Sequence, residues 1–185
     1  DLVEPMSLDE AFLDVTENKK NIPYATEIAK EIKEKIFQKT LLTASAGVSF
    51  NKFLAKVASD YKKPDGLTVI TPKNADQFIN KLPIRKFFGV GKVTEKKMAK
   101  LWINTGWDLK QKSLQYLSAN FGKNGNYFYQ IAHNLDNRPV NPHRIRKSIG
   151  TERTFAQDIN DLKTMQKYIQ KFADEISTWL KKHQK

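Results

Sequence analysis

The sequence contains no cysteine, which excludes disulfide bonds and thiolate metal sites and fits a reducing compartment such as the cytoplasm. It also lacks any run of about 18 apolar residues and any signal-peptide pattern, so we expect no membrane partner and no secretion. Only three histidines occur, and neither His133 nor His143 has partners at metal-ligand spacing. We therefore expect neither histidine to belong to a metal site.

Charge is distributed unevenly along the 185 residues. Lys and Arg outnumber Asp and Glu by 32 to 20, a net charge of +12. Residues 1–72 carry 10 basic and 11 acidic side chains, whereas residues 73–185 carry 22 and 9. A basic second part suits a partner made of phosphates, although a lysine-rich surface that only keeps a protein soluble has the same composition. The length allows one large domain or two small ones.

Two adjacent carboxylates, Asp9 and Glu10, stand at the start of a strand predicted over residues 11–16, which would pair with an incoming strand over residues 1–5. Their neighbours Leu8 and Ala11 are apolar, and two negative charges crowded near an apolar surface favour a bound cation. Such oxygen ligands suit Mg²⁺, which binds one or two carboxylates together with substrate phosphates. The alternative is an exposed acidic pair at a strand end, because short motifs often match by chance.

Apolar spacing predicts the elements that follow. A helix is expected at residues 24–38, a strand of small residues at 42–49, a helix at 51–60 and a last strand at 66–70. This order of strands and helices is typical of an α+β layer.

Residues 74–134 are predicted to form helices without strands. A short helix is expected at residues 82–88, and a second helix ends near Trp102. The glycine-rich turn between them consists of Gly89, Val90, Gly91 and Lys92. Glycines let the backbone approach a phosphate closely, and the helix that follows offers free N–H groups and a positive dipole. A purely structural connection is the alternative, but the position in the basic part favours binding to a DNA backbone through a helix-hairpin-helix.

The string Ser7-Leu8-Asp9-Glu10-Ala11-Phe12-Leu13-Asp14 closely resembles the palm motif of Y-family (translesion) DNA polymerases, especially the bacterial DNA polymerase IV branch. The segment from Ser49 to Ser59 resembles the family pattern Ser-x-Asn-Lys-x-x-Ala-Lys-x-Ala-Ser. Three further segments resemble the family in the same order along the chain: the glycine-rich turn, residues 132–140, and residues 146–155. In residues 132–140, Asn134 replaces the usual glycine, and Asn is the next-best residue for a left-handed helix cap.

The resemblance implies roles for these residues. Asp9 and Glu10 would be catalytic carboxylates that hold Mg²⁺, two ions in the intact enzyme, and Lys56 would reach the triphosphate of the incoming nucleotide. A lysine at a helix edge with its ammonium in solvent is the alternative for Lys56, and Lys52 is a secondary candidate. The residues expected to contact DNA are Gly89, Val90, Gly91, Lys92, Arg144, Arg146, Lys147 and Ser148.

The expected fold is therefore α+β and has four parts. Residues 1–72 would form part of a polymerase palm, with an antiparallel sheet and helices, and residues 73–138 a small all-helical thumb with the helix-hairpin-helix. Residues 139–147 would be a basic linker. Residues 148–185 would be the first strand and helix of the little finger, with the strand at residues 148–155 and the helix at about residues 162–182, where apolar residues fall on one stripe. This sequence has no counterpart of several parts of the family: the N-terminal strand with a further metal-binding acid, the fingers, the aromatic residue that excludes ribonucleotides, and most of the little finger. We therefore expect a fragment that is inactive alone.

The intact protein would extend a primer on template DNA with deoxynucleoside triphosphates, and would bind a sliding clamp through C-terminal residues that this sequence lacks. A non-catalytic helix-hairpin-helix DNA-binding module is the main alternative. An unrelated metal-dependent phosphohydrolase that uses Asp9 and Glu10 is a third possibility, but no further ligand set supports it. Metal-dependent primer extension by the intact protein distinguishes the first two hypotheses.

Overall fold

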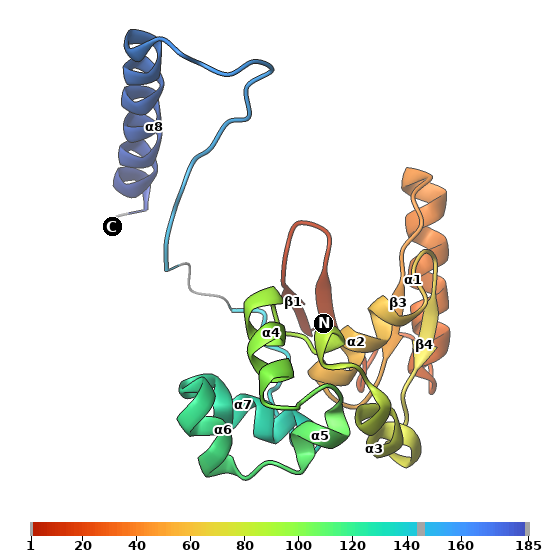
Figure 1. The fold of residues 1–185 in the computed structure, drawn as a ribbon. Helices are drawn as coiled ribbons and strands as arrows, with labels where there is room; N and C mark the ends of the chain where they lie inside the picture. Colours follow the sequence, from red (N-terminus) through yellow and green to blue (C-terminus); the bar gives the residue numbers. More distant parts are fainter. Residues whose placement is uncertain (1, 144–146, 184–185) are drawn as a thin grey trace. The chain divides into compact units, whose positions relative to one another are not determined.

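The computed structural model describes residues 2–143 and 147–183, which form strands and helices of an α+β fold (Figure 1). The chain divides into two compact units, residues 1–142 and residues 143–185. The boundary lies inside the predicted linker at residues 139–147, while the segments expected to be palm and thumb both belong to the first unit. The expected α+β class is confirmed.

The first unit begins with an antiparallel hairpin of β1 (Leu2–Pro5) and β2 (Ala11–Asp14). Pro5 lies opposite Ala11 in the register, at the last pair before the turn, where its missing N–H is tolerated. The turn is closed by a hydrogen bond in which the Met6 N–H donates to the Glu10 carbonyl at 2.8 Å. The predicted hairpin is thus confirmed, although its second strand is shorter than residues 11–16.

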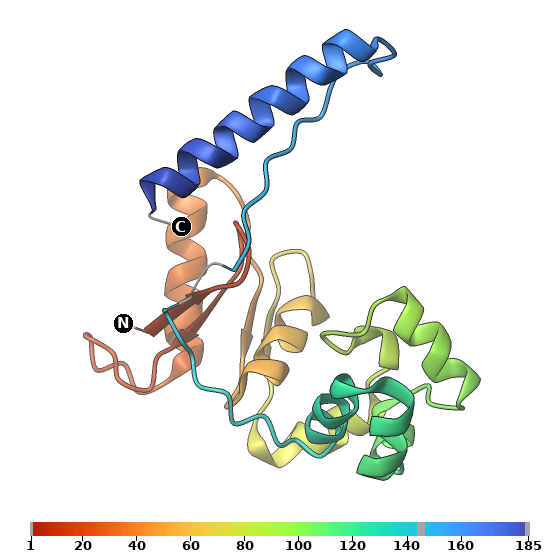
Figure 2. The same ribbon diagram turned by 90° about the vertical axis from the view of Figure 1, so that its left-hand side faces the viewer.

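A second pair of strands, β3 (Ala46–Val48) and β4 (Leu67–Val69), is parallel, so the expected antiparallel pairing holds only for β1 and β2. The reason is the helical crossover α2 (Lys52–Tyr61), which returns the chain to the end of the sheet where β3 starts, so that β4 runs in the same direction as β3. Helices α1 (Ala25–Thr40) and α2 both pack against β3, and they lie on opposite sides of the β3–β4 pair (Figure 2).

The closest packing in this region is between β3 and α2. A Cβ atom on Gly47 would lie 2.0 Å from the Ala55 carbonyl oxygen, so only glycine allows the helix to approach the strand this closely. Phe53, Leu54 and Val57 of α2 are consequently buried. This agrees with the small residues that the sequence places in the strand.

The rest of the first unit is helical. Its elements are α3 (Pro72–Lys81), the 3₁₀ helix η1 (Ile84–Lys86), α4 (Lys92–Lys100), α5 (Gly106–Lys110), α6 (Leu114–Phe121) and α7 (Lys123–Ala132). Their buried side chains continue the apolar cluster that starts at Phe53, so α2 and the helices share one core. Asn134 follows α7 with φ of 57°, which confirms the predicted left-handed cap.

The second unit contains a single long helix, α8 (Leu162–Lys182), with the predicted bounds. The strand predicted at residues 148–155 is wrong: no described residue pairs with this segment, and a strand is not stable without a partner for its backbone groups. The segment instead contacts α8, because Phe155 lies edge-on to Tyr168 with ring centroids 4.6 Å apart and Thr151 donates a hydrogen bond to Glu175.

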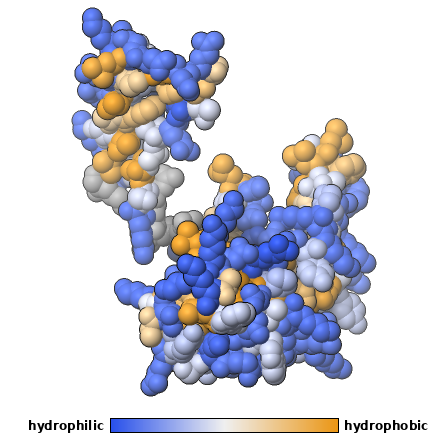
Figure 3. All heavy atoms as spheres, viewed as in Figure 1, coloured by the Kyte–Doolittle hydropathy of each residue, from blue (hydrophilic) through white to orange (hydrophobic). Residues whose placement is uncertain are grey.

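The apolar stripe of α8 lies at the surface of its unit. None of the helix residues is buried, and Leu162 and Ile169 are 67% and 66% exposed. Figure 3 shows apolar side chains gathered on this helix. Across residues 2–143 and 147–183, no helix has both the length and the apolar character needed to cross a membrane.

Candidate active site

The two adjacent carboxylates lie in the hairpin turn, directly before β2. Asp9 is exposed and its Oδ1 accepts a hydrogen bond from the Ser7 hydroxyl at 2.7 Å. Glu10 is half-buried, and its backbone carbonyl accepts the N–H bond that closes the turn. The turn therefore fixes the backbone of both residues at the end of the hairpin.

Lys56 reaches this turn from the middle of α2. Its Nζ lies 3.1 Å from Glu10 Oε1 and 2.6 Å from Asp60 Oδ2, and 11% of its side chain is exposed. Burial lowers the pKa of Lys56, but the hydrogen bonds to Asp60 and Glu10 outweigh burial and leave that pKa raised. The ammonium is therefore charged at neutral pH and held beside the carboxylate pair.

Glu10 and Lys56 were predicted as site residues from separate motifs of the sequence, and the structure brings them into contact. Asp60 was not predicted to belong to the site. Its signal in the sequence was its spacing of four residues from Lys56 on one helix, at which opposite charges meet. Asp60 thus accepts a second hydrogen bond from the Lys56 ammonium, in addition to the one that Glu10 accepts.

The glycine-rich turn lies near the same lysine. The Lys56 Nζ is 6.0 Å from the ring centroid of Phe88, which directly precedes Gly89. Gly89 has φ of 92°, a left-handed conformation that favours glycine, whereas Gly91 has φ of −86° and begins α4 as its N-cap. No atom lies within 4 Å of a Cβ built on Gly91, so the surface before α4 is open.

Four predicted DNA-binding residues lie elsewhere in the chain. Lys147 and Ser148 are exposed residues of the second unit. Arg144 and Arg146 lie outside the described residues.

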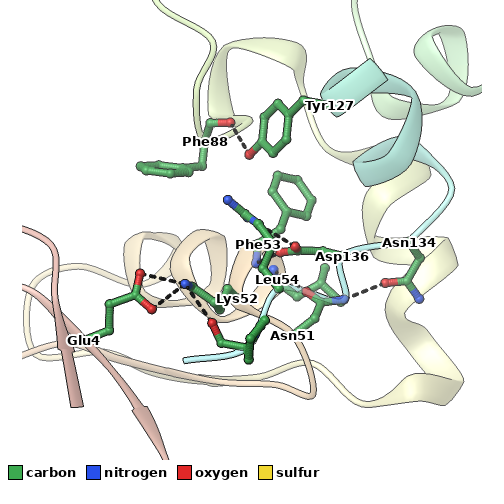
Figure 4. Close-up of polar contacts among 11 residues, drawn as sticks. Glu4, Asn51, Lys52, Phe53, Leu54, Phe88, Tyr127, Asn134 and Asp136 are labelled. Carbon is green, nitrogen blue, oxygen red and sulfur yellow. Dashed lines mark hydrogen bonds and ion pairs between the residues drawn. The ribbon is translucent and has the colours of Figure 1, made fainter. Parts of the chain in front are cut away.

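Lys52, the secondary candidate, holds the hairpin and α2 together. Its Nζ lies 2.7 and 2.6 Å from the two carboxylate oxygens of Glu4, and it also donates to the Pro139 carbonyl at 3.3 Å (Figure 4). The N–H of Asn141 donates to the same carboxylate at 2.7 Å. These hydrogen bonds, from Asn141 and then Lys52, lower the pKa of Glu4. Lys52 therefore has structural partners in Glu4 and Pro139.

The donor set fits part of a magnesium site. Asp9 and Glu10 supply the carboxylate oxygens that Mg²⁺ prefers, and this ion takes its other ligands from water and substrate phosphates. Within the described part of the chain, no group of three or more His, Asp or Glu side chains could hold a metal by itself. The pair would therefore need oxygen ligands from a substrate or from residues beyond this sequence.

Three segments of the chain match models of known protein families. Residues 1–60 match the impB/mucB/samB family, residues 72–101 the IMS family HHH motif, and residues 146–185 the impB/mucB/samB family C-terminal domain. The chain is 57% identical to DNA polymerase IV 2 of Agrobacterium fabrum over 175 residues, which are 95% of this chain and 49% of that protein. It is 52% identical to DNA polymerase IV of Clostridioides difficile over 186 residues, 100% of this chain and 51% of that protein.

The chain belongs to the Y-family of DNA polymerases, in the DNA polymerase IV branch. The family membership inferred from the palm motif is therefore confirmed. This Y-family chain spans about half the length of the curated relatives it matches.

Solved structures of Y-family polymerases have the same fold. A Y-family DNA polymerase chimera matches with a TM-score of 0.82 and 34% identity over 96% of this chain and 52% of its own. DinB from Sulfolobus solfataricus matches with a TM-score of 0.69 and 36% identity over 77% of this chain and 42% of its own. An insertion ternary complex of Dbh DNA polymerase matches with a TM-score of 0.68 and 36% identity over 76% of this chain and 41% of its own.

Proposed function

We propose that the protein to which this chain belongs is a template-directed translesion DNA polymerase, which adds deoxynucleotides to a primer 3′ end by two-metal phosphoryl transfer. The observation that carries the proposal is the contact between Lys56 and Glu10, which sets a charged ammonium beside a carboxylate pair suited to Mg²⁺. The membership of the Y-family and the DNA polymerase IV names of its relatives support it.

In this proposal Asp9 and Glu10 hold the metal, together with phosphate oxygens of the nucleotide and a further acid outside this sequence. When bound, two Mg²⁺ ions supply positive charge at the attacking 3′ oxygen and at the leaving pyrophosphate. Lys56 acts on the nucleotide itself. Its ammonium binds triphosphate oxygens and offsets the negative charge that develops on the leaving group. The hydrogen bonds to Asp60 and Glu10 keep this ammonium charged and in place.

The glycine-rich turn would hold the primer–template duplex. Gly91 leaves the start of α4 open, so a phosphate can approach the first N–H groups of the helix, and Lys92 adds a positive charge there. From the second unit, Lys147, Ser148 and the arginines at 144 and 146 would add contacts to the DNA backbone. A sliding clamp would bind through residues beyond this sequence, and the activity on DNA would be cytoplasmic.

Single-nucleotide incorporation by the intact protein tests the proposal. Asp9→Asn or Glu10→Gln should reduce the rate by roughly a thousandfold or more, because losing a metal ligand leaves several kcal/mol of developing charge uncompensated. DNA affinity should change little. Glu17→Gln, which removes an exposed carboxylate from the loop after the hairpin, is the matched control and should keep the wild-type rate. Wild-type extension by the Asp9→Asn variant would refute the assignment.

A non-catalytic DNA-binding module is the second candidate, and the basic composition of residues 73–185 favours it. It requires that the intact protein bind primed DNA and extend no primer under any divalent metal. The 185-residue chain alone is expected to bind DNA without extension in both cases, so the intact protein decides between them.

A further inference from the structure

Asp136, in the segment after α7, is the one charged residue that is buried among those the structure describes, with 8% of its surface exposed. Its Oδ2 accepts a hydrogen bond at 2.8 Å from the N–H of Phe53, the second residue of α2. A carboxylate at this place accepts a hydrogen bond from a free N–H of the helix and interacts favourably with the positive end of the helix dipole. Asp136 therefore holds the start of the helix that carries Lys56.

Arg138 also binds this carboxylate. Its Nε donates to Asp136 Oδ1 at 2.6 Å and its Nη2 to Oδ2 at 2.9 Å, a two-bond fork that sets the orientation of both groups. Burial by itself would raise the pKa of Asp136, but the bonds from Arg138 and the Phe53 N–H outweigh it, and the pKa is lowered. The guanidinium also lies 5.4 Å from the ring centroid of Tyr127, on α7.

Tyr127 continues the connection to the glycine-rich turn. Its hydroxyl donates to the Phe88 carbonyl at 3.0 Å (Figure 4), and its ring lies 3.2 Å from a Cβ built on Gly89. A continuous series of contacts thus runs from the first turn of α2 to the turn expected to grip DNA. At the same place the ring centroid of Phe53 lies 5.3 Å from that of Phe87.

A general contribution to stability does not account for this choice of residues. The Arg138 side chain is 48% exposed, so water screens part of its attraction to Asp136, whereas the two-bond fork still specifies direction and distance. The two ends of the series are also the two places where the proposed reaction needs a fixed geometry, since Lys56 is on α2 and the DNA backbone would lie on the Phe88–Gly91 turn.

We propose that Asp136, Arg138 and Tyr127 are positioning residues that link the start of α2 to the Phe88–Gly91 turn, so that Lys56 keeps a fixed place relative to the bound DNA. The consequence for catalysis rests on the proposed polymerase function. The link itself does not, and it can be tested on the 185-residue chain.

Amide hydrogen exchange tests the link at its two ends. The Phe53 N–H is bonded to Asp136, and the Val90 N–H donates to the Phe87 carbonyl at 3.0 Å within the turn. Arg138→Gln and Tyr127→Phe should each speed exchange at both amides by about tenfold, because either change interrupts the series. Tyr116→Phe, a similar loss of a hydroxyl on the neighbouring α6, should change neither.

The Leu117 amide, which donates to the carbonyl of Ser113 at the N-cap of α6, is the reference for a general loss of stability in the same experiment. A larger increase at Phe53 and Val90 than at Leu117 supports the link. Faster exchange at one end only would show that the two ends are independent, and an equal increase at Leu117 would show a general loss of stability. Either of these outcomes overturns the proposal.

Kinetics of the intact protein test the consequence. Arg138→Lys keeps the charge but loses the fork, so incorporation at saturating nucleotide should fall about tenfold, while the dissociation constant for DNA changes less than about twofold. Tyr127→Phe should act in the same direction and Tyr116→Phe should not. Unchanged incorporation by both Arg138→Lys and Tyr127→Phe would overturn the positioning role. A wild-type protein that extends no primer would refute the polymerase function and leave the exchange result standing.

Discussion

Lys56 is held by two carboxylates of different elements, Glu10 in the hairpin turn and Asp60 one helical turn further along α2. Replacing Lys56 with alanine in the intact protein should remove the charge that we propose binds the triphosphate. We expect the Michaelis constant for the nucleotide to rise and incorporation to slow by roughly a hundredfold in kcat/KM, with DNA affinity almost unchanged. Steady-state incorporation over a nucleotide series measures both constants.

Lys62→Ala is the control for that experiment, because it removes an exposed lysine at the end of the same helix. If Lys62→Ala lowers kcat/KM as much as Lys56→Ala, the effect comes from general charge and the role of Lys56 is wrong.

Asp136 gives the stability of the chain a defined dependence on pH. Its pKa is lowered from the ordinary value of 3.8, so its contribution is present above that value and is lost as the pH falls through the folded-state pKa. Asp136→Asn should therefore reduce the free energy of unfolding by about 2 kcal/mol at pH 7 and by progressively less below about pH 4. Urea denaturation of both proteins between pH 7 and pH 3 measures the difference.

A constant difference between the two proteins across this pH range would contradict the ionised state of Asp136. Asp161→Asn is the matched control, because that aspartate caps α8 in the second unit and its own lowered pKa comes from Thr164. Its loss should leave unfolding of the first unit unchanged at every pH.

The candidate site shows what a sequence can and cannot predict at this scale. Asp9, Glu10 and Lys56 stand in local motifs, and the structure adds that two of them touch. Asp136 has no local signal of burial, since its bond to the Phe53 N–H joins residues 83 positions apart. Such a residue is buried only after α2 and the segment following α7 have met, and spacing along the chain does not reveal that contact.

At the scale of elements, the two glycines of the helix-hairpin-helix have different roles. Gly89 is needed for the backbone conformation of the turn, and Gly91 keeps the surface before α4 open. Gly89 has φ of 92° and Tyr127 lies 3.2 Å from its Cβ position, so Gly89→Ala strains the turn and should destabilise the chain by about 1–2 kcal/mol. Gly91 has neither constraint, so the melting temperature of Gly91→Ala should stay within a few degrees of the wild-type value. The added methyl group should still weaken DNA binding, because it blocks the close approach of a phosphate to the backbone.

Thermal melting and DNA affinity, measured for both variants on several duplex sequences, check this prediction. The loss of affinity should be equal on every sequence, because contacts to phosphates carry no sequence information. Full DNA affinity in Gly91→Ala would show that the backbone before α4 makes no close contact with a phosphate.

The elements that were predicted correctly have signals carried by their own residues. The α8 helix has a regular apolar stripe, and the hairpin of β1 and β2 has a compact turn between its strands. The incorrect strand at residues 148–155 had alternating residues but no partner. The parallel pairing of β3 and β4 depends on the crossover through α2.

At the scale of the whole chain, the charge asymmetry predicts how DNA binding responds to salt. Residues 73–185 carry 22 basic and 9 acidic side chains, while residues 1–72 are nearly neutral. Binding through phosphates releases counterions, so neutralising even three phosphates should lower affinity about fortyfold between 50 and 200 mM salt. Fluorescence anisotropy of the 185-residue chain with labelled primed DNA, over a salt series, measures the slope.

Lysine variants then locate the contacts. Lys92→Gln, at the start of α4, should reduce the slope by about one phosphate equivalent and weaken binding equally on all sequences. Lys39→Gln, in the last turn of α1, removes the same charge from the nearly neutral part of the chain and should leave the slope unchanged. If both variants lower the slope equally, the chain binds DNA through its net charge and not through the helix-hairpin-helix. Equal affinity of the wild-type chain at low and high salt would exclude binding through phosphates altogether.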